Sequence, residues 1–334
     1  MSRFIKSAVC RVCSTYLRLT SLALLTLLSV STSYADTYPS HPIRVLVGYG
    51  AGGAVDLVAR TVGQAISYDL GQPVVIENKP GAGSNISIKT VIDSPPDGYT
   101  LLLATNALAA NMALYQPAPF DAEKDLSPIA LVGRVPVVLA VRTSSPYLNI
   151  KQLLTAAKAK PNSINYGTPG NGSTPHMAIE FFEKESKLSF KHIPSRDGSL
   201  AITDVISGQV DMVVVNALEV QSYVKSGQLR VLAVFSSNRS PIFPEVPTVA
   251  ELGYPGFEES VWYGFVVPAG TPKPMIDRLH DEIQKALATT DVKERIAAVG
   301  GEVTPGSTEM FKKLIHSERM RYEKLVHDAG IKPD

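Results

Sequence analysis

The sequence predicts an α/β fold in which two lobes are joined by two strand crossings. Short apolar runs rich in β-branched residues alternate with amphipathic stretches, which is typical of parallel sheets covered by helices on both faces. Three glycine-rich loops follow strands of this pattern, two in the first half of the chain and one in the second. A chain of 334 residues is too long for one small core, so two domains are expected.

The first 35 residues predict a secretory signal peptide. Four basic residues and no acidic one precede an apolar core at residues 19–30, which is short for a membrane span. The small-x-small pattern that ends at Ala35 predicts cleavage after Ala35 and a periplasmic location. The alternative is an uncleaved membrane anchor.

Removal of this segment changes the composition. Both cysteines, Cys10 and Cys13, lie within it, so the mature chain is expected to have no disulfide and no thiol chemistry. Of the 32 basic residues 28 remain, against 31 acidic ones, which gives a formal net charge of −3. This balance argues against a nucleic-acid partner and against a polybasic membrane-binding patch.

The stretch at residues 43–60 predicts a buried strand, a glycine loop and the start of a helix that ends at Gly71. Backbone N–H groups at a helix start have no intrahelical acceptor and lie at the positive end of the helix dipole. A glycine loop lets an anion approach them closely. We therefore expect this stretch to form one half of an anion-binding site.

An alternative reading of the same loop is dinucleotide binding. Residues 48–53 spell GxGxxG, and the next strand, at residues 74–76, ends on Glu77, where a dinucleotide fold places its ribose-binding acid. The protein would then be an exported NAD-type oxidoreductase. This spacing is weak evidence by itself, because glycines cluster in many strand-to-helix turns.

The first lobe continues with a second glycine loop at residues 77–85, which carries Ser84 and Asn85 and leads into a helix at residues 86–92. The following strand, at residues 101–103, ends at Thr105 and Asn106. Open α/β sheets bind ligands at the carboxyl ends of their strands. These polar strand ends are therefore candidate ligand contacts.

The second lobe repeats the alternation. A strand at residues 135–141 is expected to cross into it, and a strand at residues 261–267 to return, so that lobe 1 comprises residues 36–137 and 262–334 and lobe 2 residues 138–261. The expected elements between the crossings are helices at 149–160, after residue 173 and at 199–207, and strands at 164–167, 210–215 and 229–235. Two long helices, at 271–288 and 307–329, complete lobe 1. The glycine loops then meet in a hinged cleft.

Metal binding and catalysis are poorly supported. The six histidines lack metal-ligand spacing, and no GxSxG nucleophile elbow occurs, so we expect neither a metal nor a cofactor nor an enzyme. Asp56, in the first turn of its helix, is a favourable dipole partner rather than a catalytic acid. His176, after the third glycine loop, either faces the ligand or has a capping or packing role.

The loops offer backbone N–H groups, hydroxyls and amides, which suit a carboxylate. Ser173 or Thr174 is expected to cap the helix after the third glycine loop, at residues 168–173. Arg196 is the one cation in a candidate loop. It either clamps a ligand carboxylate or pairs with Asp197 at the surface.

Nine motifs, in order along residues 38–332, carry a resemblance to a known family. They are VGYGAGGAVDLVAR, VVIENKPGAGSNI, PPDGYTLLLAT, YGTPGNGSTPHMA, SGQVDMVVV, SGQLRVLAV, FPEVPTVAELGYPGFE, WYGFVVPAGTPKP and VHDAGIK. Together they resemble the extracytoplasmic solute receptors of the tripartite tricarboxylate transporters, the Bug family. The resemblance implies a type II periplasmic-binding-protein-like clamshell that closes on a small carboxylate and delivers it to a membrane permease.

The family's ligand contacts carry over to the first glycine loop, to the third glycine loop with His176 and more weakly Arg196, and to the strand end at Thr105 and Asn106. With the candidates identified above, the predicted ligand-binding residues are Tyr49, Gly50, Ala51, Gly52, Gly53, Asp56, Ser84, Asn85, Thr105, Asn106, Gly172, Ser173, Thr174, His176, Ser195, Arg196, Asp197 and Asn216.

The chain departs from the family pattern at the site. Gly48-Tyr49 replaces Pro-Phe, Val55 replaces a hydroxyl residue, Ser195-Arg196-Asp197 replaces Tyr-Lys-Gly, and Asn216 stands where Asp is frequent. As a hypothesis, Asp197 selects a ligand that carries an amine or amide. Dicarboxylates, tricarboxylates, amino acids and aromatic acids all stay open as ligands.

A binding protein needs no catalytic group at its ligand site. A ligand that bridges two lobes binds the closed form better and shifts the population toward it. We expect a monomer. Besides the oxidoreductase, a ligand-sensing subunit of a signalling system is an alternative that shares the fold and the site.

Overall fold

The computed structural model describes residues 38–298 and 300–331. The predicted signal peptide and its cleavage site after Ala35 lie outside the described residues. Residues His41–Asp334 form one compact unit, and the fold below is that of this unit.

Ten strands are present in the described residues of this unit. They are β1 (Ile43–Val47), β2 (Val74–Asn78), β3 (Thr100–Ala104), β4 (Leu126–Arg142), β5 (Asn165–Thr168), β6 (Lys191–Pro194), β7 (Met212–Asn216), β8 (Leu229–Val234), β9 (Ser260–Pro268) and β10 (Glu302–Gly306).

The helices of the same residues alternate with these strands. They are α2 (Ala54–Leu70), α3 (Asn85–Ile92), α4 (Ala107–Leu114), α5 (Ala122–Asp125), α6 (Ile150–Ala159), α7 (Thr174–Ser186), α8 (Gly198–Ser207), α9 (Ala217–Lys225), α10 (Lys273–Ala288), α11 (Thr290–Ala298) and α12 (Thr308–Ala329), with 3₁₀ turns at Ala82–Ser84 and Ala250–Leu252.

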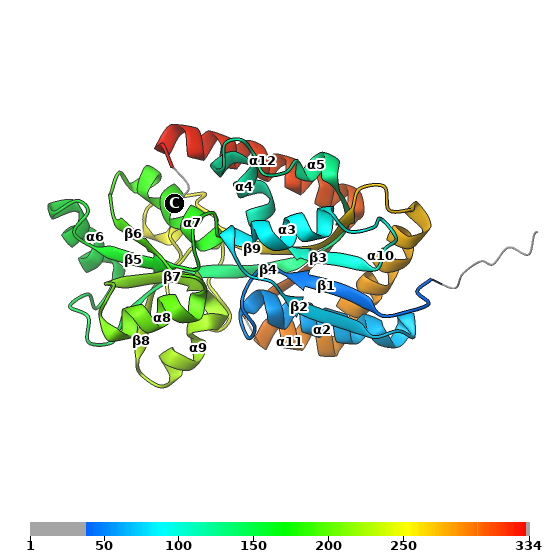
Figure 1. The fold of residues 1–334 in the computed structure, drawn as a ribbon. Coiled ribbons are helices and arrows are strands. Elements are labelled where there is room, and N and C mark those ends of the chain that lie inside the picture. Colours follow the sequence, from blue (N-terminus) through cyan, green and yellow to red (C-terminus); the bar gives the residue numbers. More distant parts are fainter. Residues whose placement is uncertain (1–37, 299, 332–334) are drawn as a thin grey trace, which may run out of the picture. The chain divides into compact units, whose positions relative to one another are not determined.

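The long strand β4 belongs to two sheets (Figure 1). In the first sheet, β1 lies parallel between β2 and β3, and β9 pairs antiparallel with both β3 and β4. In the second sheet, β5 lies parallel between β6 and β7, and both β7 and β8 pair antiparallel with β4. The two-lobed α/β fold expected from the sequence is confirmed. The lobe boundaries at residues 137/138 and 261/262 stay a prediction.

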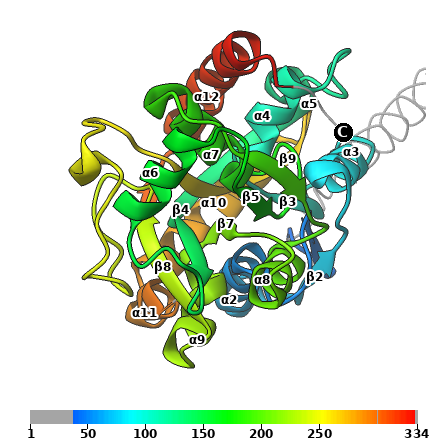
Figure 2. The same ribbon diagram turned by 90° about the vertical axis from the view of Figure 1, so that its left-hand side faces the viewer.

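Each sheet has its own buried apolar cluster. Leu46, Leu102 and Phe311 are members of the cluster at the first sheet. Val138 and Val213 are members of the one at the second sheet. Helices α3, α4 and α12 lie on one side of the first sheet, and α2 and α11 lie on the other (Figure 1). Helices α6, α7 and α8 lie beside the second sheet (Figure 2). These two clusters are the physical basis of the two lobes, and a third buried cluster packs α7 against α4 and α12.

The predicted helix ends are confirmed where a cap residue marks them. Helix α2 stops at Gly71 and α12 at Gly330, both with a left-handed backbone that glycine adopts without strain. Asn149 caps α6, and Ser173, rather than Thr174, caps α7. The side-chain oxygen of each accepts a hydrogen bond from a backbone N–H of the first turn.

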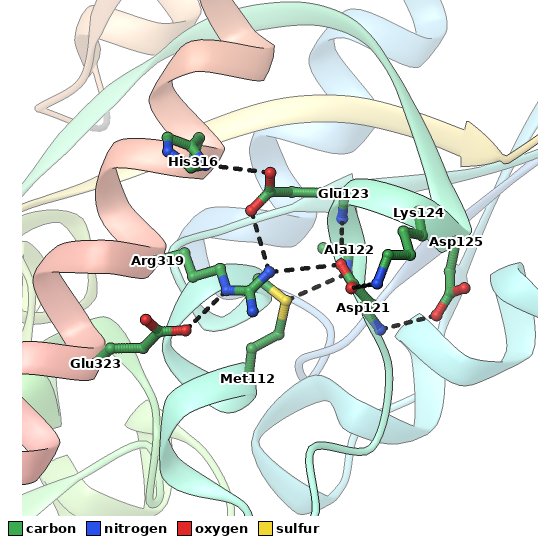
Figure 3. Close-up of polar contacts among 9 residues, drawn as sticks. All are labelled: Met112, Asp121, Ala122, Glu123, Lys124, Asp125, His316, Arg319 and Glu323. Carbon is green, nitrogen blue, oxygen red and sulfur yellow. Dashed lines mark hydrogen bonds and ion pairs between the residues drawn. The ribbon is translucent and has the colours of Figure 1, made fainter.

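The last helix, α12, is held to α5 by a cluster of charged side chains (Figure 3). The Arg319 guanidinium forms ion pairs with Asp121 at 3.6 Å, with Glu123 at 3.2 Å and with Glu323 at 2.8 Å. His316 lies 3.2 Å from the second carboxylate oxygen of Glu123. None of the helices in the described residues is both long and apolar enough to cross a membrane.

Candidate functional site

A cavity of about 60 Å³ lies where loops of the two sheets face each other. One water molecule requires roughly 10–15 Å³ on this measure, so the cavity has room for a small molecule. Most of its lining residues come from the carboxyl ends of strands and from the first turns of the helices that follow, and Val261 comes from the start of β9. The lining residues are Tyr49, Gly50, Ala51, Gly53, Ala54, Val55, Thr105, Pro169, Ser173, Thr174, Pro175, Asp197, Gly198, Ser199, Asn216, Glu219 and Val261.

The first glycine loop, between β1 and α2, is held in shape by Asp56. This buried carboxylate accepts hydrogen bonds from the Gly52 N–H and from Nδ2 of Asn78, both at 2.9 Å, and pairs with Arg60 at 2.9 Å. Burial raises the pKa of Asp56, but the hydrogen bonds from Arg60, Gly52 and Asn78 bring it below its ordinary value. Asp56 therefore stays ionised and orients the loop, while the first backbone N–H groups of α2 have no intrahelical acceptor.

Tyr49 and Thr105 connect this loop to the end of β3. The Tyr49 hydroxyl lies 3.4 Å from Oγ1 of Thr105, and both residues line the cavity. The pKa of Tyr49 is raised, mainly because the phenol is buried, so the phenol stays protonated. Gly48 packs directly against Ser84 of the second glycine loop. A side chain at position 48 would collide with the Ser84 hydroxyl.

The third glycine loop brings the start of α7 to the opposite side of the cavity. The Ser173 hydroxyl donates to the Gly170 carbonyl at 2.6 Å and accepts from the His176 N–H at 3.4 Å. Thr174 is 1% exposed, and its hydroxyl has no hydrogen-bond partner in the described residues. Since a buried hydroxyl without a partner is unfavourable, Thr174 is free to bind a ligand.

The His176 side chain packs against His192 and the third glycine loop. Its ring stacks on His192 with 4.2 Å between the ring centroids, and its Nδ1 accepts from the Gly172 N–H at 3.3 Å. Burial, followed by the neighbouring His176, lowers the pKa of His192 to about 2, so His192 stays neutral. Of the two roles considered for His176, the contacts fit packing under the loop.

Two acidic residues, Asp197 and Glu219, also line the cavity. Asp197 caps α8 by accepting a hydrogen bond from the Leu200 N–H at 2.9 Å. Glu219, in the first turn of α9, accepts from Nδ2 of Asn216 at 2.7 Å. Burial raises the pKa of Glu219 to about 7, with Asn216 opposing the increase and Asp197 adding to it. Glu219 was not among the predicted ligand-binding residues. The sequence signal for it is an acidic residue three positions after the polar end of a strand, here Asn216.

The predicted site residues fall into three groups. Those that line the cavity are Tyr49, Gly50, Ala51, Gly53, Thr105, Ser173, Thr174, Asp197 and Asn216. Those that line a neighbouring cavity are Ser84, Ser195 and Arg196, so Arg196 lies apart from the central cavity. Those that the structure places outside both linings are Gly52, Asp56, Asn85, Asn106, Gly172 and His176.

Two asparagines of the third group have internal hydrogen bonds. Asn106 accepts from the Trp262 N–H at 2.9 Å and lies 3.1 Å from the Tyr322 hydroxyl, so it ties β9 and α12 to the end of β3. Asn85 accepts from Nδ2 of Asn111 at 2.7 Å. In residues 38–298 and 300–331, no group of three or more His, Cys, Asp or Glu side chains is arranged to hold a metal ion.

Comparison with known proteins identifies the architecture. The family model described as "Tripartite tricarboxylate transporter family receptor" matches residues 58–331. Protein BugT of Bordetella pertussis is 35% identical over 300 residues, which cover 89% of this chain and 92% of BugT. The structure of the periplasmic binding protein BugD is 31% identical, with a TM-score of 0.83 over 89% of this chain and 100% of BugD.

A third similar protein was solved with a bound carboxylate. This R. palustris protein, Rpa4515 with adipate, is 29% identical and has a TM-score of 0.84 over 89% of this chain and 100% of its own. These proteins are solute-binding proteins, which favours a receptor over the oxidoreductase and sensing alternatives. The chain belongs to the Bug family of tripartite tricarboxylate transporter receptors, whose members are periplasmic solute-binding proteins.

Proposed function

We propose that this receptor captures a small carboxylate between its two lobes and delivers it to the membrane permease of a tripartite transporter. The observation that carries the proposal is the convergence of the α2 and α7 starts on one cavity, together with the Tyr49 and Thr174 hydroxyls. Unpaired N–H groups at helix starts bind anions without a basic side chain. The adipate bound by the R. palustris relative supports this ligand class.

The proposed ligand contacts are the nine predicted residues that line the cavity, with Glu219 added to them. Asp56, Asn85, Asn106, Gly172 and His176 would act indirectly, by holding the loops and strand ends in place. Ligand binding between lobe 1, at residues 36–137 and 262–334, and lobe 2, at residues 138–261, would shift the population toward a closed form that docks on the permease.

The working form of the protein follows from the same proposal. It is an exported monomer, cleaved after Ala35, that binds without catalysing a reaction. No cofactor is needed, because capture and release depend only on the difference in affinity between the open and closed forms.

A binding experiment with a glycine variant tests the proposal. Wild-type protein, screened by thermal shift against aliphatic, hydroxy and aromatic carboxylic acids, should gain stability with at least one of them. Gly53→Val should lose that gain, because the valine side chain would project from a residue that lines the cavity. Ala288→Val, at an exposed residue of α10, is the control. Failure of every acid to stabilise wild-type protein would contradict the carboxylate proposal.

A further inference from the structure

The cavity is lined by two chemically different sets of groups. One set consists of hydrogen-bond donors, which are the backbone N–H groups at the α2 start and the Thr174 hydroxyl. The other set consists of the side chains of Glu219, Asn216 and Asp197, here called the acceptor cluster. Among the described residues that line the cavity, the charged side chains are Asp197 and Glu219, both of them acidic. A single carboxylate accounts for the donors and leaves the acceptor cluster without a ligand group.

The acceptor cluster contains buried atoms that have no partner. Oε1 of Glu219 accepts from Nδ2 of Asn216, but Oε2 of Glu219 and Oδ1 of Asn216 are buried without a hydrogen bond in the described residues. Asn216 is only 5% exposed. Native structures satisfy nearly all of their buried polar atoms, so unpaired acceptors on a cavity wall indicate a ligand that donates hydrogen bonds.

The position of Glu219 is fixed by its neighbours. Gly198, the first residue of α8, packs against its carboxylate so closely that a β-carbon at position 198 would collide with Oε2. From the other sheet, Gly50 approaches Asp197, and a β-carbon at position 50 would lie 3.7 Å from Oδ2 of Asp197. The Gly198 contact depends on the absence of a side chain, whereas a β-carbon at position 50 would make an ordinary van der Waals contact. The two contacts bring the two carboxylates to the same part of the cavity.

We propose that the solute is a carboxylate that also carries a protonated amine, with Glu219 as the residue that selects it. The carboxylate binds at the starts of α2 and α7, and the ammonium group donates to Glu219, Asn216 and Asp197. An ammonium group has three N–H donors, and the acceptor cluster offers three oxygens that can receive them. This inference rests on the proposed function, since it names the class of carboxylate that the same cavity takes.

A second ligand carboxylate fits the acceptor cluster less well. It would need a protonated Glu219 or a tyrosine hydroxyl as its donor and would lie beside the Asp197 carboxylate, whose charge repels it. The Nδ2 group of Asn216 already donates to Glu219. The Tyr49 and Tyr263 hydroxyls, which also face Glu219, carry no positive charge. The titratable groups that face Glu219 are Asp197, Tyr49 and Tyr263, so no basic group among those facing it in the described residues neutralises a second carboxylate.

Calorimetric titrations with matched acids test the inference. The pairs are glutarate with 4-aminobutyrate, in which an ammonium group replaces one carboxylate, and succinate with aspartate, in which an amine is added. Wild-type protein should bind the amine-bearing member of at least one pair at least tenfold more tightly. Glu219→Gln should reduce that preference by tenfold or more. Glu309→Gln, at an exposed first-turn glutamate of α12, should leave it unchanged.

A second measurement on wild-type protein does not depend on the variant folding. Ammonium binding requires an ionised Glu219, so affinity for the amine-bearing acid should fall as the pH decreases from 8 to 5. Tighter binding of the dicarboxylates, with affinity that rises on acidification, would overturn the inference and leave the proposed function intact. No binding of any carboxylic acid, here or in the thermal-shift screen, would overturn both.

Discussion

Replacement of Glu219 by glutamine should change the pH dependence of stability in the ligand-free receptor. The pKa of the Glu219 carboxyl is raised from 4.5 to about 7, mainly by burial. An acid with a raised folded-state pKa keeps its proton longer in the folded state than in the unfolded chain. Its ionisation therefore lowers the free energy of unfolding as the pH rises from about 4.5 to about 7, and the loss is complete above that range.

The size of this effect follows from the pKa difference. One pKa unit corresponds to about 1.4 kcal/mol, so ionisation of Glu219 should cost roughly 3 kcal/mol of stability. Glu219→Gln cannot ionise and should lack this loss. The difference in free energy of unfolding between variant and wild type should then grow by roughly 3 kcal/mol between pH 4.5 and pH 8. In a protein of this size that is a melting-temperature difference of several degrees.

Urea denaturation followed by circular dichroism, at several pH values between 4.5 and 8.5, measures this difference. Glu309→Gln again serves as the control, because it removes a carboxylate that is exposed. A Glu219→Gln difference that does not vary with pH would contradict the conclusion that burial raises the pKa of Glu219.

Other predictions concern the loops and the C-terminal helix. Asp56→Ala should destabilise the protein by about 1–3 kcal/mol in urea denaturation and weaken ligand binding, because the Gly52 N–H and the Asn78 amide lose their acceptor; unchanged affinity would contradict the loop-orienting role. Gly198→Ala should weaken the preference for amine-bearing acids by displacing the Glu219 carboxylate, as measured by calorimetry; an unchanged preference would count against Glu219. Arg319→Ala should cost about 1 kcal/mol at low salt and less in high salt, because its ion pairs to α5 are partly exposed.

Much of the fold could be predicted because the pattern of apolar residues determines it locally. The strand at residues 43–47, the stop of α2 at Gly71 and the caps at Asn149 and Ser173 all follow from periodicity and cap chemistry. The length of β4 could not be predicted in the same way. Its first half, with Ser127 and Pro128, lacks a strand pattern and is ordered by antiparallel pairing with β9 and β10, which lie far away in the sequence.

The candidate site also has parts that the local sequence predicts and parts that depend on packing between distant segments. Glycines and hydroxyls at strand ends indicated the first and third loops, and both line one cavity. Local reasoning could not distinguish a residue that faces the cavity from one that supports it. Asp56 and Asn106 are polar and lie at the right chain positions, but their side chains are satisfied by partners from other elements. Glu219 was missed because its burial depends on the close packing of Gly198, which only the folded chain reveals.

The most direct test of the proposed function is native mass spectrometry of the receptor, purified from the periplasm after expression of the full chain and without added ligand. We expect a polypeptide that begins at Asp36 and retains a small amine-bearing carboxylic acid, which is lost when the protein unfolds. A retained molecule of dinucleotide mass would contradict the assignment as a carboxylate receptor, because it would assign the first glycine loop to a nicotinamide cofactor.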